Sequence, residues 1–201
     1  MYTLEDGEYL TRLARRVIAE HLKGNKTQIP GKPTEKLREK AGVFVTMETY
    51  PKKDLRGCIG YPEPVMPLVE ALMKAAVSAA TNDPRFPPLQ LEELETILVE
   101  VSVLTKPKVL TVKPKKYVNQ IDIGKHGLIV EHGFNRGLLL PQVAVDENWD
   151  KEDFLAHTCM KAGLLPDAWL DEDTKVYRFE GIVFMELIPE GRVVVRELKK
   201  G

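Results

Sequence analysis

The chain has 201 residues, and 29 Lys and Arg against 30 Asp and Glu give a net charge of −1 at pH 7, which offers no global reason to expect a nucleic-acid partner. A hydrophobic fraction of 43% excludes intrinsic disorder, and two cysteines are too few for a disulfide framework. Because no apolar run approaches the roughly 18 residues of a membrane helix and the N-terminus lacks a signal-peptide core, we expect a cytoplasmic protein without membrane association.

Hydrophobic periodicity predicts helices in some segments and strands in others. In chain order we expect a helix over residues 6–23 with Asp6 as its N-cap, a polar connection over 25–40, a strand over 42–49 with a hairpin partner over 55–61, a helix over 67–81, a helical turn over 91–94, a strand over 96–105, a Lys-rich connection over 106–116, a hairpin over 127–140, a helix over 151–162, and strands over 176–188 and 193–198.

The predicted strands occur mostly in hairpins and do not alternate regularly with helices. This order predicts an α+β fold with an antiparallel or mixed β-sheet flanked by helices, and it argues against a doubly wound parallel sheet. The length fits a single domain with a larger and a smaller part. A charged fraction of 29% and 14 prolines, mostly between regular segments, are typical of heat-adapted proteins.

The most unusual local sequence is LRGCIGY, residues 55–61. Glycine weakens a strand, so Gly57 and Gly60 inside one indicate a bulge or a close backbone approach. They leave the backbone around Cys58 uncovered and place Arg56 on the same face, where a guanidinium would favour the reactive thiolate. Alternatively, Cys58 is a small buried hydrophobic residue and the glycines let the following helix pack closely.

A second candidate is the loop that follows the helix over 67–81. Pro84 stiffens this loop, which can therefore present Asp83 and Arg85 rigidly to a cleft. Alternatively the segment only ends the helix, with Arg85 complementing the helix dipole and Phe86 filling the core.

A third candidate is His126, which lies close to Gly124 and next to Gly127 at the start of a predicted strand. An imidazole there can serve as acid, base or ligand, although a histidine in a turn is the alternative. The histidines and cysteines show no metal-ligand spacing, so we expect no metal, and the sequence leaves any cofactor unknown. Phosphate-binding loops, dinucleotide fingerprints and nucleophile elbows are also absent from the sequence, which argues against ATP hydrolysis, Rossmann-type cofactor use and α/β-hydrolase chemistry.

The run LRGCIG, residues 55–60, matches without a change the signature of the AMMECR family, named for a human chromosomal region linked to Alport syndrome, mental retardation, midface hypoplasia and elliptocytosis. Residues 79–94, 100–107, 123–143 and 154–169 also resemble this family, so the resemblance covers nearly the whole chain. It implies an α+β fold with a larger and a smaller subdomain and a cleft between the two, but no agreed activity. Grouping of microbial relatives with Memo-like and radical-SAM proteins implies a redox or metal-linked pathway.

These observations together favour a cleft-based small-molecule or enzymatic site built around Arg56-Gly57-Cys58. In this hypothesis Asp and Arg side chains fix a polar substrate, the cysteine is a nucleophile or redox group, and the histidine moves a proton. The candidate catalytic residues are Cys58, Arg56, His126 and Asp83, and the candidate ligand-binding residues are Gly57, Gly60, Arg85 and Phe86.

Two other functions are open at this stage. A non-catalytic interaction module would dock a protein partner through the loop over 84–89 and a sheet edge. Nucleic-acid binding ranks third, through Lys106, Lys108, Lys113, Lys115 and Lys116. The sequence leaves the substrate, the reaction type, the oligomeric state and the physiological partner open.

Overall fold

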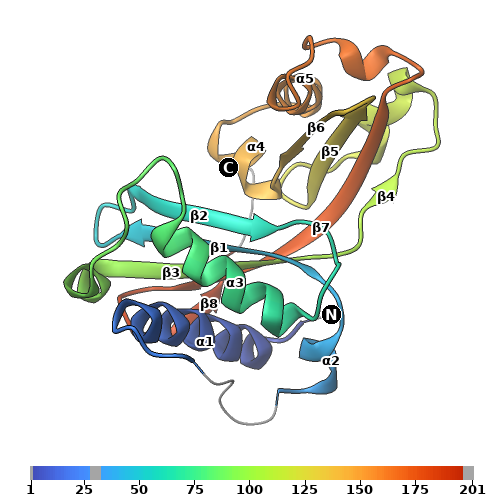
Figure 1. Cartoon of the computed structure of the whole chain (residues 1–201). Helices are drawn as coiled ribbons and strands as arrows, with labels where there is room; N and C mark the ends of the chain where they lie inside the picture. The colour runs from blue at the N-terminus through green and yellow to red at the C-terminus, as the bar shows by residue number, and fades with distance from the viewer. Residues whose placement is uncertain (1, 28–32, 197–201) are drawn as a thin grey trace. The chain divides into compact units, whose positions relative to one another are not determined.

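The computed structural model describes residues 2–27 and 33–196 and has a mixed α+β architecture (Figure 1). The α-helices are α1 (Leu4–Leu22), α2 (Glu35–Arg38), α3 (Leu68–Thr81), α4 (Pro141–Asp146) and α5 (Lys151–Lys161). The strands are β1 (Gly42–Thr49), β2 (Leu55–Tyr61), β3 (Ile97–Leu104), β4 (Lys108–Val109), β5 (His126–His132), β6 (Asn135–Leu139), β7 (Lys175–Glu186) and β8 (Val193–Val195). Short 3-10 helices are η1 (Leu91–Thr96), η2 (Pro114–Gln120) and η3 (Ala168–Leu170).

The strands form a sheet in the order β2-β1-β3-β7-β5-β6, with β4 and β8 paired to β7. The chain divides into two compact units, which we call unit 1, the described residues up to Leu104 with Ile182–Arg196, and unit 2, Thr105–Gly181. Strand β7 therefore contributes its first half to unit 2 and its second half to unit 1. The α+β prediction, with an antiparallel sheet flanked by helices, is confirmed.

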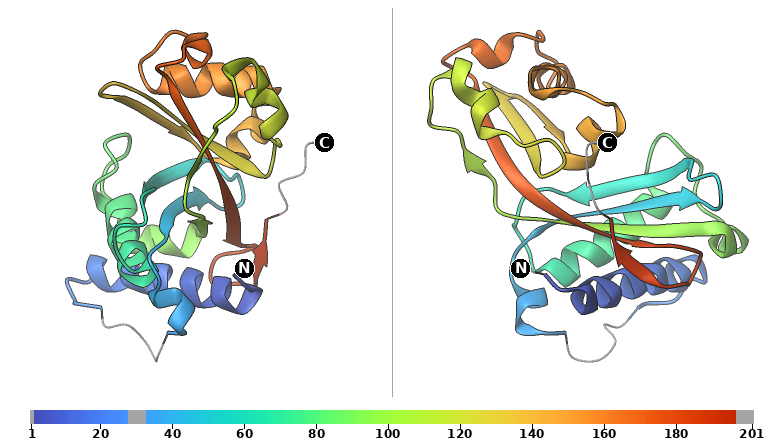
Figure 2. Two further views of the ribbon diagram at one scale, coloured as in Figure 1. Left: turned by 90° about the vertical axis from the view of Figure 1, so that its right-hand side faces the viewer. Right: turned by 180° about the vertical axis from the view of Figure 1, so that it is seen from behind.

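In unit 1, helices α1 and α3 cover one face of the sheet (Figures 1 and 2). Alternate residues of each strand point to this face because side chains along a strand alternate sides. From β1 these are Val43, Val45 and Met47, which are fully buried in the unit 1 core. We call this side of the unit 1 sheet the helix face; the opposite side carries the candidate site.

The N-terminus of α1 differs from its prediction. Its N-cap is Thr3, whose side chain accepts a hydrogen bond from the Asp6 backbone N–H, while Asp6 accepts one from the Thr3 backbone N–H in return. This reciprocal capping box satisfies two backbone donors that have no partner within the helix. The prediction of Asp6 as N-cap is therefore wrong. The N-cap lies three residues earlier, and Asp6 is the third residue of the helix.

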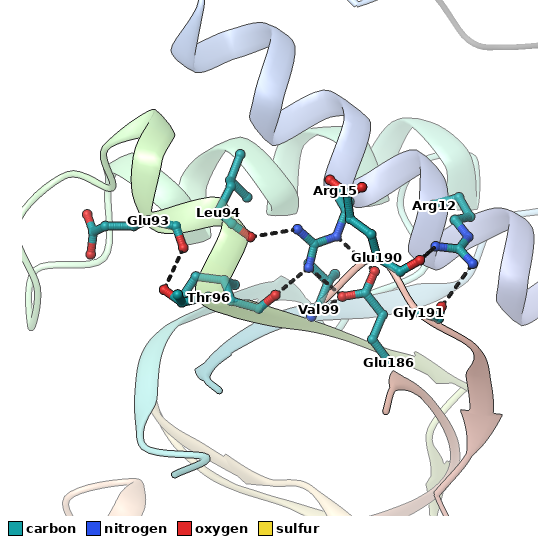
Figure 3. Close-up of polar contacts among 10 residues, drawn as sticks. Arg12, Arg15, Glu93, Leu94, Thr96, Val99, Glu186, Glu190 and Gly191 are labelled. Atoms are coloured by element: carbon teal, nitrogen blue, oxygen red, sulfur yellow. Dashed lines mark hydrogen bonds and ion pairs between the residues drawn. The ribbon is translucent and has the colours of Figure 1, made fainter. Parts of the chain in front are cut away.

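A buried ion pair links α1 to the end of β7 on the helix face (Figure 3). The Arg15 Nε donates to Glu186 Oε1 at 2.8 Å, and Nη2 donates to Oε2 at 2.5 Å. Arg15 also donates to the carbonyls of Leu94 and Ile97, and the Val99 backbone N–H donates to Glu186 Oε2. The charged groups of Arg15 and Glu186 are both buried and hydrogen-bonded, which is the condition under which a buried ion pair is tolerated.

Unit 2 surrounds a second core that includes Phe154, Leu155 and Trp169. The predicted hairpin is present as β5 and β6, and α5 begins at the predicted residue. The sequence missed α2, β4, α4, η2 and η3. Pro141 is the first residue of α4, a position where its missing N–H costs nothing.

The C-terminal strand was predicted over 193–198, and β8 covers Val193–Val195, while residues 197 and 198 lie outside the described residues. In the described ranges, no helix has both the length and the apolar character required to cross a membrane.

Candidate functional site

The face of the unit 1 sheet opposite the helices carries a cross-strand set of polar side chains. Cys58 on β2 pairs with Thr46 on β1, which pairs with Glu100 on β3. The Thr46 Oγ1 donates to Cys58 Sγ at 3.3 Å, and Arg196 Nη1 donates to Glu100 Oε2 at 3.2 Å. Thr46 and Glu100 are buried, whereas Cys58 is half-buried. We call Cys58, Thr46, Glu100 and Arg196 the polar row.

Asp83 and Arg85 occupy the outer edge of β2 at Cys58. The Cys58 backbone N–H donates to Asp83 Oδ2 at 2.8 Å, and Arg85 Nη2 donates to the Cys58 carbonyl at 3.2 Å. Because β2 is the edge strand, these backbone groups point away from β1 and would otherwise have no ladder partner. The loop after α3 therefore holds a carboxylate and a guanidinium against the backbone of Cys58.

Asp83 and Arg85 also bind each other directly. Arg85 Nε and Nη2 donate to the two Asp83 carboxylate oxygens at 2.9 and 2.7 Å. These hydrogen bonds, together with those from the backbone, hold the pKa of Asp83 well below its usual range and raise the pKa of Arg85. The Asp83 side chain is 2% exposed and that of Arg85 is 53% exposed, so the guanidinium retains a face open to solvent.

The electrostatics of Cys58 contradict one expectation from the sequence. Burial raises the pKa of the Cys58 thiol, although the hydrogen bond from Thr46 and the charge of Arg85 act in the opposite direction. A raised pKa favours the protonated thiol, in the opposite direction to the thiolate that the sequence predicted. The guanidinium that acts on Cys58 is that of Arg85, not that of Arg56.

Arg56 is directed away from Cys58 by an irregularity in the hairpin. Met47 pairs with Gly57 and Glu48 pairs with Leu55, which leaves Arg56 as the extra residue of a bulge. A bulge re-aims the side chain that it carries. Arg56 Nε and Nη2 donate to the two Glu93 carboxylate oxygens at 2.9 and 3.1 Å, and Nη1 donates to the Pro87 carbonyl.

Phe86 lies near the guanidinium groups of both Arg56 and Arg85. Its ring centroid is 6.0 Å from the Arg56 guanidinium carbon and 5.5 Å from that of Arg85. These are cation–π distances. Phe86 is half-buried, so it supports both guanidinium groups and does not fill the core as the alternative interpretation required.

The two glycines beside Cys58 have packing roles. A Cβ at Gly57 would lie 2.3 Å from the Ala79 carbonyl oxygen of α3, and one at Gly60 would lie 2.3 Å from the Phe44 ring. Gly57 thus permits the close approach of α3 that the sequence offered as an alternative. Direct ligand binding by either glycine stays a prediction.

His126 belongs to unit 2, where it is the first residue of β5. Its Nδ1 accepts a hydrogen bond from the Asp122 backbone N–H at 2.9 Å, and its side chain is 5% exposed. The structure therefore brings Cys58, Asp83 and Arg85 together in unit 1. Arg56 lies in the adjacent bulge of β2 and binds Glu93. His126 has a separate set of neighbours in unit 2.

Sequence reasoning missed Thr46, Glu93, Glu100 and Arg196. For Glu100 a signal was present, because it is the one charged residue in the strand ILVEVSVL and it is buried. A lone carboxylate within an apolar strand requires a partner, which here includes Arg196. In residues 2–27 and 33–196, no group of three or more His, Cys, Asp or Glu side chains is arranged to hold a metal ion.

Comparisons with known proteins place this chain among archaeal relatives. It is 56% identical over 199 residues to the protein MJ0810 of Methanocaldococcus jannaschii, with 98% of each chain covered. It is also 56% identical to the protein MK0488 of Methanopyrus kandleri, with 98% of this chain and 96% of that protein covered. The crystal structure of the uncharacterized protein PH0010 from Pyrococcus horikoshii matches with a TM-score of 0.92 at 53% identity, covering 96% of this chain and 98% of that one. The AMMECR1 family profile matches residues 11–184, and the chain therefore belongs to the AMMECR1 family.

Proposed function

We propose that the polar row and the Asp83–Arg85 pair form a binding or catalytic site for a small anionic molecule, with Cys58 as its reactive group. The observation that carries this proposal is a half-buried thiol with a half-exposed guanidinium fixed beside it. Arg85 presents planar donors that suit a carboxylate or phosphate group. Asp83 keeps the guanidinium in place.

In this proposal the thiol is protonated until a reaction partner is bound. Attack by Sγ requires loss of the proton, and Thr46 lies on the strand between Cys58 and the buried carboxylate of Glu100. Thr46 thus orients Sγ, and Glu100 is the carboxylate of the polar row on the far side of Thr46. The redox or metal-linked pathway that the family resemblance implies stays a prediction.

The alternative of a docked protein strand has less support. A strand added to the edge of β2 would need the outward N–H and carbonyl of Cys58. Those groups already bind Asp83 and Arg85. Because these backbone groups are already bound, another strand cannot pair with β2 at Cys58. A ligand at this place would be recognised by side chains.

The proposal can be tested with two alkylating reagents that share a leaving group and differ in charge, iodoacetate and iodoacetamide. In a Cys159→Ser background, we compare the rate of Cys58 alkylation by iodoacetate with the rate by iodoacetamide. We expect Arg85→Gln to lower the iodoacetate-to-iodoacetamide rate ratio several-fold, because the guanidinium attracts only the anionic reagent. Arg12→Gln, a substitution elsewhere in unit 1, serves as control and should leave the ratio unchanged. An equal ratio in Arg85→Gln and in its parent would overturn the proposal.

A further inference from the structure

Unit 2 contains a pocket of about 240 Å³ that the site above does not use. Its charged and polar lining residues are Lys106, Lys108, His126, Arg178 and Glu180. Three adjacent strands supply most of them, because Lys108 on β4 lies opposite Arg178 on β7, and Glu180 on β7 lies opposite His126 on β5. The antiparallel register thus concentrates these groups at one place in unit 2.

Within the described part of the chain, Lys106, Lys108 and Arg178 of this pocket have no carboxylate partner at salt-bridge distance. Two like charges directly opposite each other on neighbouring strands are destabilising, and Lys108 and Arg178 are such a pair. Arg178 Nη1 donates to the Gln120 carbonyl, a neutral acceptor. Across residues 2–27 and 33–196, no carboxylate lies within salt-bridge distance of Lys106, Lys108 or Arg178. Glu180, the one carboxylate of the lining, lies 3.6 Å from Lys125.

The buried imidazole of His126 adds a directed hydrogen-bond donor. Since Nδ1 accepts the Asp122 backbone N–H, the neutral ring carries its proton on Nε2. Burial, together with the charge of Arg178, lowers the pKa of His126, so the ring is neutral at pH 7. Nε2 is 3.9 Å from the nearest Glu180 oxygen, which is too long for a hydrogen bond. The Nε2–H group therefore lacks an acceptor at this carboxylate.

We propose that this pocket is a binding site for a small tetrahedral oxyanion, such as the phosphate group of a small molecule, held by His126, Arg178, Lys106 and Lys108. A phosphate group accepts hydrogen bonds on several oxygens at once, which matches a guanidinium, an N–H donor and ammonium groups around one volume. The bound anion also relieves the repulsion between Lys108 and Arg178. A pocket of about 240 Å³ accommodates a phosphate group with a small substituent.

Phosphodiesters of nucleic acids share this chemistry but present a different shape. A polymer backbone lies along an exposed basic surface, whereas His126 is 4% exposed and donates from within a pocket. The ligand that fits a buried donor is a terminal phosphate. A short single-stranded oligonucleotide is therefore included in the test as a competitor.

The test is titration with inorganic phosphate, followed by calorimetry and by the ¹⁵N resonances of the His126 ring. We expect Lys108→Gln and Arg178→Gln each to weaken binding about tenfold, the effect of losing one charge-assisted hydrogen bond. His126→Asn should also weaken binding, although its side-chain oxygen can still accept the Asp122 N–H. Lys151→Gln, a substitution with the same charge change on α5, should have no effect.

Three results would overturn the proposal. One is phosphate binding that is equal in Lys108→Gln and Lys151→Gln, or undetectable in the unmodified chain. Another is a ¹⁵N spectrum that places the His126 proton on Nδ1 at pH 7. The third is an oligonucleotide that binds far more tightly than phosphate and is released by salt, which would assign these cations to nucleic acid.

Discussion

Unit 1 holds one arginine–carboxylate pair on the helix face of its sheet and another at the edge of β2, and the pairs differ in what their donors bind. On the helix face, Arg15 uses its donors on Glu186 and on two backbone carbonyls, and both side chains are at most 8% exposed. At the edge of β2, Asp83 is buried to a similar degree, but its partner Arg85 is 53% exposed. The first guanidinium is enclosed by the fold, and the second can still bind a molecule from outside.

This difference separates a structural ion pair from a candidate binding group. A fully enclosed pair fixes the position of a helix, since losing one partner leaves a buried charge uncompensated. A pair with one exposed member fixes the direction of that member. We therefore assign architecture to Arg15 and Glu186, and recognition to Arg85.

The largest effect is expected from breaking the pair on the helix face. Arg15→Met leaves Glu186 buried without its cation and should lower the free energy of unfolding by about 3–5 kcal/mol. Arg12, which lies three residues earlier on α1 and donates to backbone carbonyls of Glu190 and Gly191, provides the control. Arg12→Gln should cost much less, because that side chain is 41% exposed. Equal losses in denaturant unfolding would remove the distinction between the two arginines.

A smaller loss of stability is expected where α3 meets β2. Gly57→Ala adds a methyl group 2.3 Å from the backbone oxygen of Ala79, so the helix or the strand must shift. Overpacking of this kind costs about 1–3 kcal/mol. Denaturant unfolding of Gly57→Ala measures it, and a loss below a few tenths of a kcal/mol would show that α3 does not approach β2 this closely.

At the edge of β2, the loss of stability in acid should depend on Asp83. Because its pKa is lower in the folded chain than in the unfolded chain, its contribution to stability is complete above the unfolded value of about 3.9 and is lost as the pH falls below it. Asp83→Asn should lower the free energy of unfolding at pH 7. It should also make this free energy decrease less steeply as the pH falls from about 5 to about 2.

Glu93→Gln is the matched comparison for Asp83→Asn. The pKa of Glu93 is also lowered by its arginine, but its side chain is 38% exposed. We therefore expect Glu93→Gln to change the pH dependence of the free energy of unfolding less than Asp83→Asn does. A pH dependence that persists unchanged in Asp83→Asn would contradict the role given to the Asp83–Arg85 pair.

The smallest effect concerns the reactivity of Cys58. Its alkylation rate by iodoacetamide in a Cys159→Ser background should rise with pH through an inflection above the ordinary thiol value of 9.0. Thr46→Val removes the hydroxyl that donates to Sγ and should move this inflection higher, which slows the reaction at a fixed pH. An inflection below 8 would instead restore the thiolate that the sequence alone suggested.

Local patterns predicted α1, the β1–β2 hairpin and α3, because hydrophobic periodicity and β-branched residues act over a few positions. The Arg15–Glu186 pair was not foreseeable, since its members are 171 residues apart. Arg56 was misplaced because alternation along a strand assumes a regular ladder, and the bulge breaks it.

The most direct test of the account is the modification of the folded chain by N-ethylmaleimide, with the labelled cysteine identified by peptide mapping. The chain offers an internal comparison, because Cys58 is half-buried and Cys159 is buried in the unit 2 core with its pKa raised to about 11. We predict that the first adduct on the folded chain forms at Cys58 and that Cys159 is labelled more slowly. Protection of Cys58 until the chain unfolds, or equal labelling of both thiols, would contradict a site that small molecules reach.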